Sequence, residues 1–476
     1  MLLTLILLYM LITIPVSIYA AHRVHSSKDY VLAGRHLPFF MALATVFATW
    51  FGSDSVLGAG SAMAEGGFLN VMVDPFGAGL CLLLIGFFFA KKLYAMNHLT
   101  IGDYFAHRYN KTVATLLSIA IIFTYFGWTA AQFVALGIIL NVLLGIPMLW
   151  GMLLSAFVVV LYTYLGGMWS VSLNDTIQMG MIIVGLIVVF IEVVYKFGFT
   201  DVLKATPPEY FHLTPGGEGS MKEWLAYLAA WITLGLGSIP QQDVYQRAMS
   251  ARSASVSQHA AIWGGVMYFS ITMIPLFLGL TARMLHPELL QEGADSQMLL
   301  PTLILSHISF PTQVLFFGAL LAAIMSTASG AILAPATLLA ENVVKPFFRE
   351  LSDTMRLHLI RWSIIGIAII ALFVAIQQGD IYEIVGASYS ITLVSAFVPL
   401  AVGLYSHRAT ALGAMLSLLL GALSWQYVEH FGGDDPLVPS IIVGVLMSLL
   451  GMILGTMFDH FVRKHTPHHH EEGHAH

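Results

Sequence analysis

Apolar residues fall along this chain into thirteen long stretches, separated by short segments that hold most of the polar side chains. A membrane-crossing helix needs about 20 apolar residues to span the hydrocarbon core of a bilayer. Every backbone N–H and C=O in lipid must also be bonded within its own segment, which a helix achieves. The pattern therefore predicts an all-α integral membrane protein with about 13 transmembrane helices. The predicted spans are residues 1–21, 38–64, 67–93, 112–143, 146–166, 171–196, 224–247, 258–285, 311–344, 358–378, 381–404, 409–428 and 438–463.

Composition supports this class. Hydrophobic residues make up 58% of the 476 residues, charged residues 10%, and the mean hydropathy is +0.82. A soluble domain carries about 25% charged residues, so a water-soluble fold is excluded. The net charge of −6 lacks the excess of basic residues that is typical of nucleic-acid-binding proteins. Cys81 is the single cysteine, which excludes a disulfide framework and a cysteine-based metal site.

The first apolar stretch has no basic residues before it, unlike a secretory signal peptide, so we interpret it as a retained span.

Lysine and arginine are enriched in cytoplasmic loops, and this bias gives the orientation. With the N-terminus outside and the C-terminus in the cytoplasm, 16 of the 20 basic residues fall in inner loops. The four on the outer side are Lys196, Lys204, Lys222 and Arg283, and outer acids are Asp380, Glu383, Asp434 and Asp435. The inner set is Arg23, Lys28, Arg35, Lys91, Lys92, Arg108, Lys111, Arg247, Arg252, Lys345, Arg349, Arg356, Arg361, Arg408, Arg463 and Lys464.

Three predicted spans contain residues that interrupt helices. The second ends in GSDSVLGAGSAMAEGG, the seventh contains LGLGSIPQQDVYQR with Pro240, and the ninth contains AAIMSTASGAILAP. In secondary transporters, broken helices in corresponding halves indicate the binding site. If the second span is counted as helix 1 of a core, the seventh is helix 6, which is the spacing of a five-plus-five inverted repeat. The alternative is ordinary close packing of helices through small residues.

Two acids lie inside predicted spans. Asp54 falls in LATVFATWFGSDSVLGAG and Asp74 in LNVMVDPFGAGLCLLL. A charged side chain at membrane depth is costly unless it faces protein, water or a partner, so it indicates a functional site. This pattern favours a protein that moves polar cargo across the bilayer over a passive anchor.

Four stretches, spaced along most of the chain, match motifs of one family. They are ATWFGSDSVLGAG, YTYLGGMWSVSLNDTIQ, GSIPQQDVYQRAMSARSA and AAIMSTASGAILAPATLLAENVVK. In them and in their order, the chain resembles the sodium:solute symporter family, which includes the sodium–proline, sodium–glucose and high-affinity choline transporters. The third stretch is close to the choline branch. The resemblance implies a ten-helix inverted-repeat (LeuT-like) core with flanking helices, and sodium-driven uptake by alternating access.

On this basis the chain divides into four parts. Residues 1–37 form an extra helix with its cytoplasmic loop, 38–404 the transport core, and 405–463 two flanking helices. Residues 464–476 are a His-rich tail, either a site for divalent metal or a disordered segment. The compact loops and the family branch favour a bacterial inner membrane.

The resemblance also implies a sodium site. Its hydroxyl ligands are Ser326 and Thr327, which are adjacent in an otherwise apolar span. The implied remaining ligands are the backbone carbonyls of Ala48, Phe51 and Ala323, with Asp175 on the exit path or completing the ligand shell. Two alternatives remain open: that the hydroxyls bond back to their own helix, and that Asp175 is only an acid at a helix N-terminus.

The implied solute site has aromatic and acidic residues. Trp50 and Trp128 match positions where the choline branch uses tryptophan, and aromatic faces attract quaternary ammonium. Asp54 and Asp74 add a negative field, which favours a cationic or zwitterionic amine. The match at Asp74 is loose, and its alternative role is to brace two helices.

Four further residues concern the same pocket. Gln241 stands where the choline branch has another tryptophan, so one wall of an aromatic cage is replaced by an amide suited to an amino acid or carboxylate. Ser55 matches a position that contacts solute in sugar and proline relatives. Gln242 and Asp243 are neighbouring candidates, although Asp243 is equally consistent with a helix cap.

These features predict a symporter that imports a small polar organic solute, such as an amine or amino acid, with Na⁺. The expected partners are sodium, solute and the lipid bilayer, with no nucleic acid, and a monomer would suffice. The sequence shows no nucleophile–base pair and no phosphate-binding loop, so an enzyme is not expected. The alternatives are a transporter-like sensor working with a separate partner, and a channel.

Overall fold

The structure is a computed structural model that describes residues 2–216, 219–348, 350–377, 381–433 and 436–465. Side chains are described from residue 12 to residue 462, except in those gaps and at residues 382–384 and 387. The described residues form helices and connecting turns, with one isolated bridge between Leu37 and Ala251. Some predictions fall outside this description: Asp380, Asp434, Asp435, Arg349, the tail from residue 466, and the side chains of Glu383, Arg463 and Lys464.

The first half of the chain contains eleven α-helices and several short 3₁₀ or π-helical segments. The helices are α1 (Leu2–Ala21), α2 (Ser27–Leu32), α3 (Phe39–Trp50), α4 (Ala59–Gly66), α5 (Ala78–Leu84), α6 (Ala90–Met96), α7 (Ile101–Arg108), α8 (Lys111–Leu144), α9 (Met148–Phe197), α10 (Phe199–Ala205) and α11 (Met221–Gly237). The short segments are η1 (Ala33–Arg35), η2 (Asp54–Gly58), η3 (Gly67–Val71), η4 (Met72–Gly77), η5 (Ile85–Phe89) and η6 (Pro208–Phe211).

The second half begins after a break that follows α11. Its helices are α12 (Gln242–Ser250), α13 (Ala254–Leu285), α14 (Leu299–His307), α15 (Phe310–Leu338), α16 (Asp353–Gln377), α17 (Ile381–Thr392), α18 (Val398–Tyr405), α19 (Ala411–Phe431) and α20 (Ser440–His465). The short segments are η7 (Pro287–Leu290), η8 (Ser296–Met298), η9 (Leu339–Val344), η10 (Lys345–Phe347) and η11 (Leu393–Phe397).

Nine helical stretches of the described residues are long and apolar enough to cross a membrane. They are Asp54–Met96, Lys111–Leu144, Met148–Phe197, Ala254–Leu285, Phe310–Phe347, Asp353–Gln377, Ser388–Tyr405, Ala411–Phe431 and Ser440–Val462. Shorter apolar helices occupy Ile12–Ala21 and Phe39–Trp50. The all-helical membrane class is confirmed, whereas the number of 13 spans stays a prediction.

Glycine and capping residues set several boundaries. Asn110 caps α8 by accepting from the Val113 backbone N–H at 2.8 Å, and Gly145 ends it with φ of +65°. Residues 146–166 and 171–196, expected as separate spans, both belong to α9. The backbone leaves helical geometry between them at Gly167, where φ is +51° and ψ is −137°. A Cβ at Gly167 would also collide with the Tyr30 backbone, so only glycine fits there.

The break predicted in the ninth span is wrong, because α15 is continuous through it. Its small residues serve close packing instead: a Cβ on Gly330 of α15 would lie 2.7 Å from the Thr49 Cγ2 of α3. A break that the sequence did not predict occurs at Asp74, whose φ of −139° and ψ of 128° are those of extended backbone.

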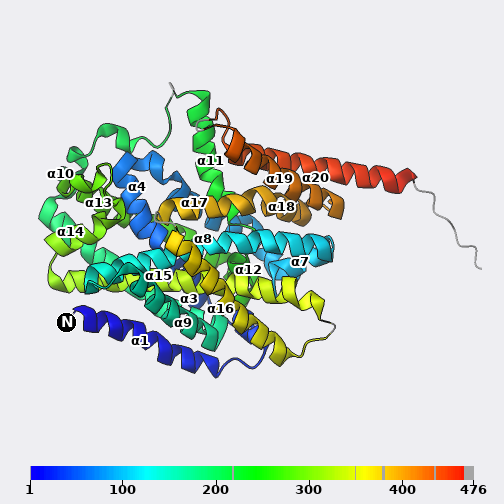
Figure 1. Cartoon of the computed structure of the whole chain (residues 1–476), viewed down its shortest axis with the longest axis horizontal. Helices are drawn as coiled ribbons and strands as arrows, with labels where there is room; N and C mark the ends of the chain where they lie inside the picture. The colour runs from blue at the N-terminus through cyan, green and yellow to red at the C-terminus, as the bar shows by residue number, and fades with distance from the viewer. Residues whose placement is uncertain (1, 217–218, 349, 378–380, 434–435, 466–476) are drawn as a thin grey trace, which may run out of the picture.

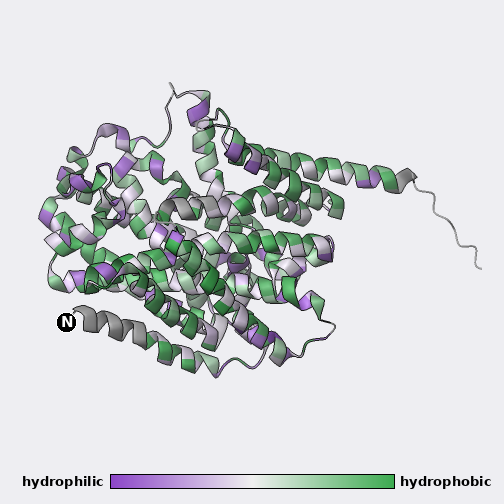
Figure 2. Ribbon diagram, in the orientation of Figure 1, coloured by the Kyte–Doolittle hydropathy of each residue, from purple (hydrophilic) through white to green (hydrophobic). Residues whose placement is uncertain are grey.

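The helices form one bundle around a buried centre. The helices α8 and α15 are its most buried long helices, and α15 packs against α3, α8 and α9. In Figure 1, α1 lies along one side beside α9, and the α19–α20 pair lies on the opposite side. Figure 2 shows that hydrophobic residues dominate the long helices. Large apolar side chains such as Phe157, Phe373 and Leu423 are exposed on them, as expected for lipid-facing surfaces.

Candidate functional site

Two interrupted helices meet in the centre of the bundle. The helix α3 ends at Trp50, and helical structure resumes at Asp54 in η2. The helix α11 ends at Gly237, and α12 begins at Gln242. Both breaks are where the sequence predicts them. The last carbonyls of an ended helix lack partners within that helix, which leaves them available to an ion.

Four of the predicted sodium ligands, from three helices, lie in contact in pairs. Thr327 Oγ1 on α15 lies 3.5 Å from the Ala48 carbonyl of α3, and Ser326 Oγ donates to Asp175 Oδ1 of α9 at 2.5 Å. Phe51 is the residue that follows α3, and Ala323 lies one turn before Ser326 and Thr327 on α15. The Thr327 hydroxyl therefore faces the Ala48 carbonyl, and the neighbouring Ser326 hydroxyl faces the Asp175 carboxylate.

The alternative for these hydroxyls was a bond back to their own helix. Two other hydroxyls of α15 bond back to their own helix. Ser329 donates to the Ser326 carbonyl at 2.8 Å, and Thr337 donates to the Leu333 carbonyl. Ser326 instead donates across to α9. Its hydroxyl is thus directed toward the interface between α3, α9 and α15.

Two threonines that sequence analysis missed complete the surroundings of Asp175. Thr45 donates to Asp175 Oδ2 at 2.5 Å, and Thr49 lies 3.4 Å from the same atom. Both residues are on α3, four residues apart, so they share one face of that helix. This four-residue spacing in a predicted helix is the signal that the sequence offers for them.

Arg247 was placed among the inner-loop cations, and that assignment is wrong. It lies within α12 and is only 3% exposed. Its guanidinium donates to the Thr49 hydroxyl at 2.6 Å, the Asp243 carbonyl at 2.9 Å and the Thr45 carbonyl at 3.3 Å. Gly330 makes room for it, since a Cβ there would collide with Nη2. Arg247 therefore joins the two broken helices.

Asp243 connects the aromatic residues near the second break. Its carboxylate accepts from Trp50 Nε1 at 3.2 Å and from the Tyr125 hydroxyl at 2.5 Å. The Trp128 ring lies 5.9 Å from Tyr125 and 5.9 Å from Tyr389, measured between centroids. Trp50 also lines a narrow cavity with Val46, Leu82, Ile85, Val244, Arg247, Ala248, Ser257 and Ala261. The predicted tryptophans thus belong to one connected cluster, although no direct contact between them is recorded among the described residues.

A second connected group lies at the first break. The Tyr268 hydroxyl of α13 donates to Asp74 Oδ1 at 2.5 Å and lies 2.6 Å from Ser55 Oγ. Asp54 precedes Ser55 and is 4% exposed, and its Oδ1 has no hydrogen-bond partner among the described residues. Asp54, Ser55 and Asp74 are thus brought together, with Tyr268 as a member that the sequence did not indicate.

The two glutamines differ. Gln241 is buried beside the second break, and its amide nitrogen has no partner in the described chain. The Gln242 oxygen accepts from the Ile101 backbone N–H of α7 at 2.9 Å. Gln242 thus supports α7 through its oxygen, while its amide nitrogen, like that of Gln241, has no partner among the described residues.

Negative charge exceeds positive charge inside the bundle. Arg247 is the one fully buried lysine or arginine among the described residues. The fully buried acids there are Asp54, Asp74, Asp175, Asp243 and Glu341. An ionised carboxylate without a partner is costly in this setting. The interior is therefore suited to binding cations.

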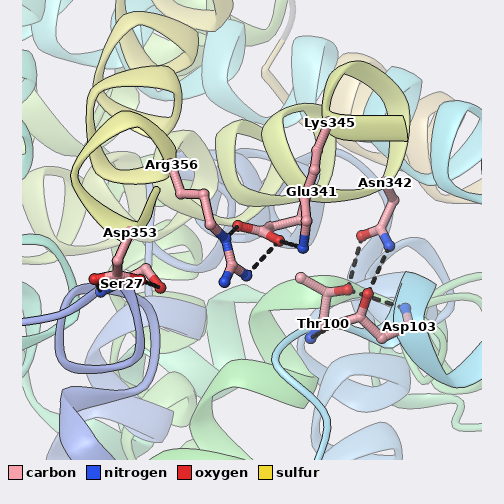
Figure 3. Close-up of polar contacts among 8 residues, drawn as sticks. All are labelled: Ser27, Thr100, Asp103, Glu341, Asn342, Lys345, Asp353 and Arg356. Atoms are coloured by element: carbon pink, nitrogen blue, oxygen red, sulfur yellow. Dashed lines mark hydrogen bonds and ion pairs between the residues drawn. The ribbon is translucent and has the colours of Figure 1, made fainter. Parts of the chain in front are cut away.

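A polar network lies at one end of the bundle, where α2, α7, η9 and α16 meet (Figure 3). Glu341 of η9 accepts from Arg356 of α16 at 3.0 and 2.7 Å and from Lys345 at 2.8 Å. Asn342 bonds to Asp103 of α7 at 3.0 Å. Asp353 accepts from the Ser27 hydroxyl and backbone N–H of α2 at 2.6 and 2.9 Å. These contacts tie α2, α7, η9 and α16 together.

Two broken helices five spans apart, with freed carbonyls opposite hydroxyls and a surplus of buried acids, define a cation-binding secondary transporter. The chain belongs to the sodium:solute symporter family, whose model matches residues 30–421. The predicted family, the inverted-repeat membrane fold and sodium-coupled symport of a small polar organic solute by alternating access are confirmed at this level.

Similar proteins agree with this assignment. The chain is 28% identical over 459 residues to the high-affinity choline transporter 1 of Caenorhabditis elegans, covering 91% of this chain and 78% of that protein. It is 27% identical over 441 residues to the sodium/pantothenate symporter of Haemophilus influenzae, covering 90% of each. Its fold is similar to that of a Na⁺-coupled sialic acid symporter in a substrate-bound outward-open state, with a TM-score of 0.81, 18% identity and coverage of 96% and 98%.

Proposed function

We propose that the chain imports a small cationic or zwitterionic amine together with sodium. Sodium binds at the carbonyls of Ala48, Phe51 and Ala323 with Ser326, Thr327 and Asp175. The solute binds between the two breaks. The residues proposed to contact it are Trp50, Asp54, Ser55, Asp74, Trp128, Gln241 and Gln242.

The observation that carries the sodium site is the contact between Thr327 Oγ1 and the Ala48 carbonyl at the end of α3. Carbonyls at the C-terminal end of a half-helix carry partial negative charge, which attracts a cation. Neutral oxygens hold the ion without a cage of acids, so it can be released after each cycle. Asp175 supplies the one full negative charge in contact with Ser326.

The surplus of buried acids supports a cationic solute. Asp243 stands in the first turn of α12 and balances the positive end of that half-helix. An anionic solute would thus meet Asp54, Asp74 and Asp243, and the described residues offer no second buried cation beside Arg247 to compensate. The aromatic rings of Trp128, Tyr125 and Tyr389 add faces that attract ammonium groups. The names of the relatives, choline for one and pantothenate for the other, leave the solute open.

We also propose the setting in which this occurs. Residues 38–404 act as the transport core, 1–37 and 405–463 flank it, and 464–476 form the tail. The protein lies in a bacterial inner membrane with its N-terminus outside and its C-terminus in the cytoplasm.

Two measurements test the function. Thermal unfolding of the purified protein is followed with choline, betaine, amino acids, monocarboxylates and sugars, each in sodium and in potassium. A ligand that binds only the folded state raises the unfolding temperature, and we expect sodium-dependent stabilisation by an amine. Stabilisation by sugars or monocarboxylates alone would refute the solute class.

The second measurement is uptake of that amine into proteoliposomes with an inward sodium gradient. Ser326→Ala combined with Thr327→Ala should abolish sodium dependence. Ser329→Ala is the matched control, since its hydroxyl bonds only within α15 and its loss leaves the site intact. If uptake by the double variant still depends on the sodium gradient, this site is excluded.

A further inference from the structure

A cavity of about 250 Å³ lies at the same end of the bundle as the network of Figure 3. Its polar lining consists of Ser27, Lys28, Asn97, His98 and Arg356, together with two leucines. These side chains come from α2, α16 and the segment between α6 and α7. We call this cavity the basic pocket, because three of its lining residues are basic and none is acidic.

We propose that the basic pocket binds a phosphate group. Lys28 and Arg356 bring two positive charges to it, and no lining carboxylate cancels them. A carboxylate offers two oxygens to donors, whereas a phosphate offers three or more, which suits a pocket whose donors come from several side chains. A water molecule needs about 10–15 Å³ of cavity, so there is room for several non-hydrogen atoms. The proposal concerns neither the sodium site nor the solute site.

The donors of the basic pocket are not engaged elsewhere. The Lys28 ammonium group and the ring nitrogens of His98 have no hydrogen-bond partner among the described residues. A neutral imidazole always carries one N–H, so His98 is a donor in either tautomer. Asn97 Oδ1 accepts from the Arg35 guanidinium, which leaves the amide nitrogen of Asn97 as the free donor.

The two acids beside the basic pocket are already bonded. Arg356 donates through Nε and Nη2 to Glu341, at 3.0 and 2.7 Å, and this pair fixes the guanidinium in place. Its Nη1 has no partner in the described part of the chain. Both oxygens of Asp353 accept from Ser27. An anion can therefore bind Arg356 through Nη1 without breaking the ion pair with Glu341.

Two sources can supply the phosphate group. Lys28 and Asn97 are exposed, so the basic pocket opens at the surface. In the proposed orientation this surface is cytoplasmic. Anionic lipid headgroups of the inner leaflet and soluble phosphate compounds both occur there, and basic pockets between helices bind such headgroups.

Thermal unfolding of the purified full-length protein tests the proposal. In the first arm, inorganic phosphate replaces chloride in neutral detergent, at constant ionic strength and constant sodium. In the second arm, the protein is placed in nanodiscs of phosphatidylcholine, alone or mixed with phosphatidylglycerol. A ligand of the folded state raises the unfolding temperature. A rise with inorganic phosphate indicates a soluble ligand, and a rise only with phosphatidylglycerol indicates a lipid headgroup.

Variants assign the effect to the basic pocket. Lys28→Gln removes a charge at an exposed position and should require about ten times more ligand for half of the stabilisation. Lys91→Gln is the matched control, because Lys91 is an exposed lysine before α7 but outside the pocket, and it should behave as the wild type. His98→Ala removes a donor from another segment, repeats the test if Lys28→Gln does not fold, and should also weaken the effect several times.

Three results would overturn the proposal. The first is that neither inorganic phosphate nor phosphatidylglycerol raises the unfolding temperature of the wild type. The second is that Lys28→Gln and His98→Ala respond as the wild type does in both arms. The third is an equal loss in Lys28→Gln and Lys91→Gln, which would show that general surface charge, and not the pocket, attracts the anion.

Discussion

Asp175 accepts hydrogen bonds from three hydroxyl groups, those of Ser326, Thr45 and Thr49. Asp175→Asn keeps the size of the side chain but removes its charge. We expect the sodium concentration for half-maximal uptake to rise about tenfold, which corresponds to about 1.4 kcal/mol. Uptake measured over a range of sodium concentrations checks this, with Asp201→Asn on the exposed helix α10 as the control. An unchanged sodium dependence would remove Asp175 from the site.

Arg247 is the second residue whose role can be measured alone. Arg247→Lys keeps the positive charge but loses the planar fork that reaches Thr49 and the Thr45 and Asp243 carbonyls together. Each buried acceptor left without a donor costs about 1–3 kcal/mol. We expect the apparent unfolding temperature to fall by several degrees, whereas Arg252→Lys, at an exposed position, should leave it unchanged. Equal stability of the two variants would contradict the network.

The residues that could be predicted are those with a strong local signal. Ser326 and Thr327 stand out as adjacent hydroxyls in an apolar helix, and the structure directs them to the expected interface. Tyr268 and Arg247 had no such signal. The helices α8 and α15 are buried on nearly all sides, so hydrophobic periodicity does not tell which residues face each other. Such partners depend on how distant helices pack.

At the scale of elements, the contacts of Figure 3 hold η9 against α16 and α7. Glu341→Gln removes the charge that Arg356 and Lys345 share, and the end of the bundle should then open more often. A cysteine in place of Ala106, which lines the adjacent cavity, reports this opening when Cys81 is replaced by alanine. We expect its reaction with a water-soluble maleimide to become several times faster.

The control for that experiment is another glutamate in an ion pair. Glu288→Gln breaks a surface contact with His286 between α13 and α14, away from the network of Figure 3. It should leave the labelling rate of the cysteine unchanged. If Glu341→Gln and Glu288→Gln give the same rate, the network does not control this end of the bundle.

The breaks show how far elements could be predicted. Glycine and Pro240 indicated the interruptions after α3 and α11, because both residue types fit poorly inside helices. The same composition in α15 serves close packing, since a run of small residues has two uses that sequence alone does not separate. The interruption at Asp74 had little local signal, as an isolated X–Pro pair also occurs in kinked helices.

At the scale of the whole molecule, the start of α1 and the end of α20 lie at opposite ends of the bundle in Figure 1. This agrees with an odd number of crossings. The helix α7 lies at one end, and α10 and α14 lie at the other. Basic side chains flank α7: Lys91 and Lys92 precede it, and Arg108 and Lys111 follow it. Because cytoplasmic loops are enriched in lysine and arginine, the end with α7 is predicted to face the cytoplasm.

Single cysteines placed at the two ends test this orientation, again with Cys81 replaced by alanine. Glu209→Cys lies in η6 after α10, and Lys91→Cys lies in α6 before α7; both positions are exposed. In intact cells a membrane-impermeant maleimide should label the cysteine at 209 and spare the one at 91. Permeabilised cells should label both. The reverse labelling pattern would mean that the protein has the opposite orientation in the membrane, with the network of Glu341 on the outer side. That network would then close the route by which solute enters, and the positive charge around α7 would need another explanation.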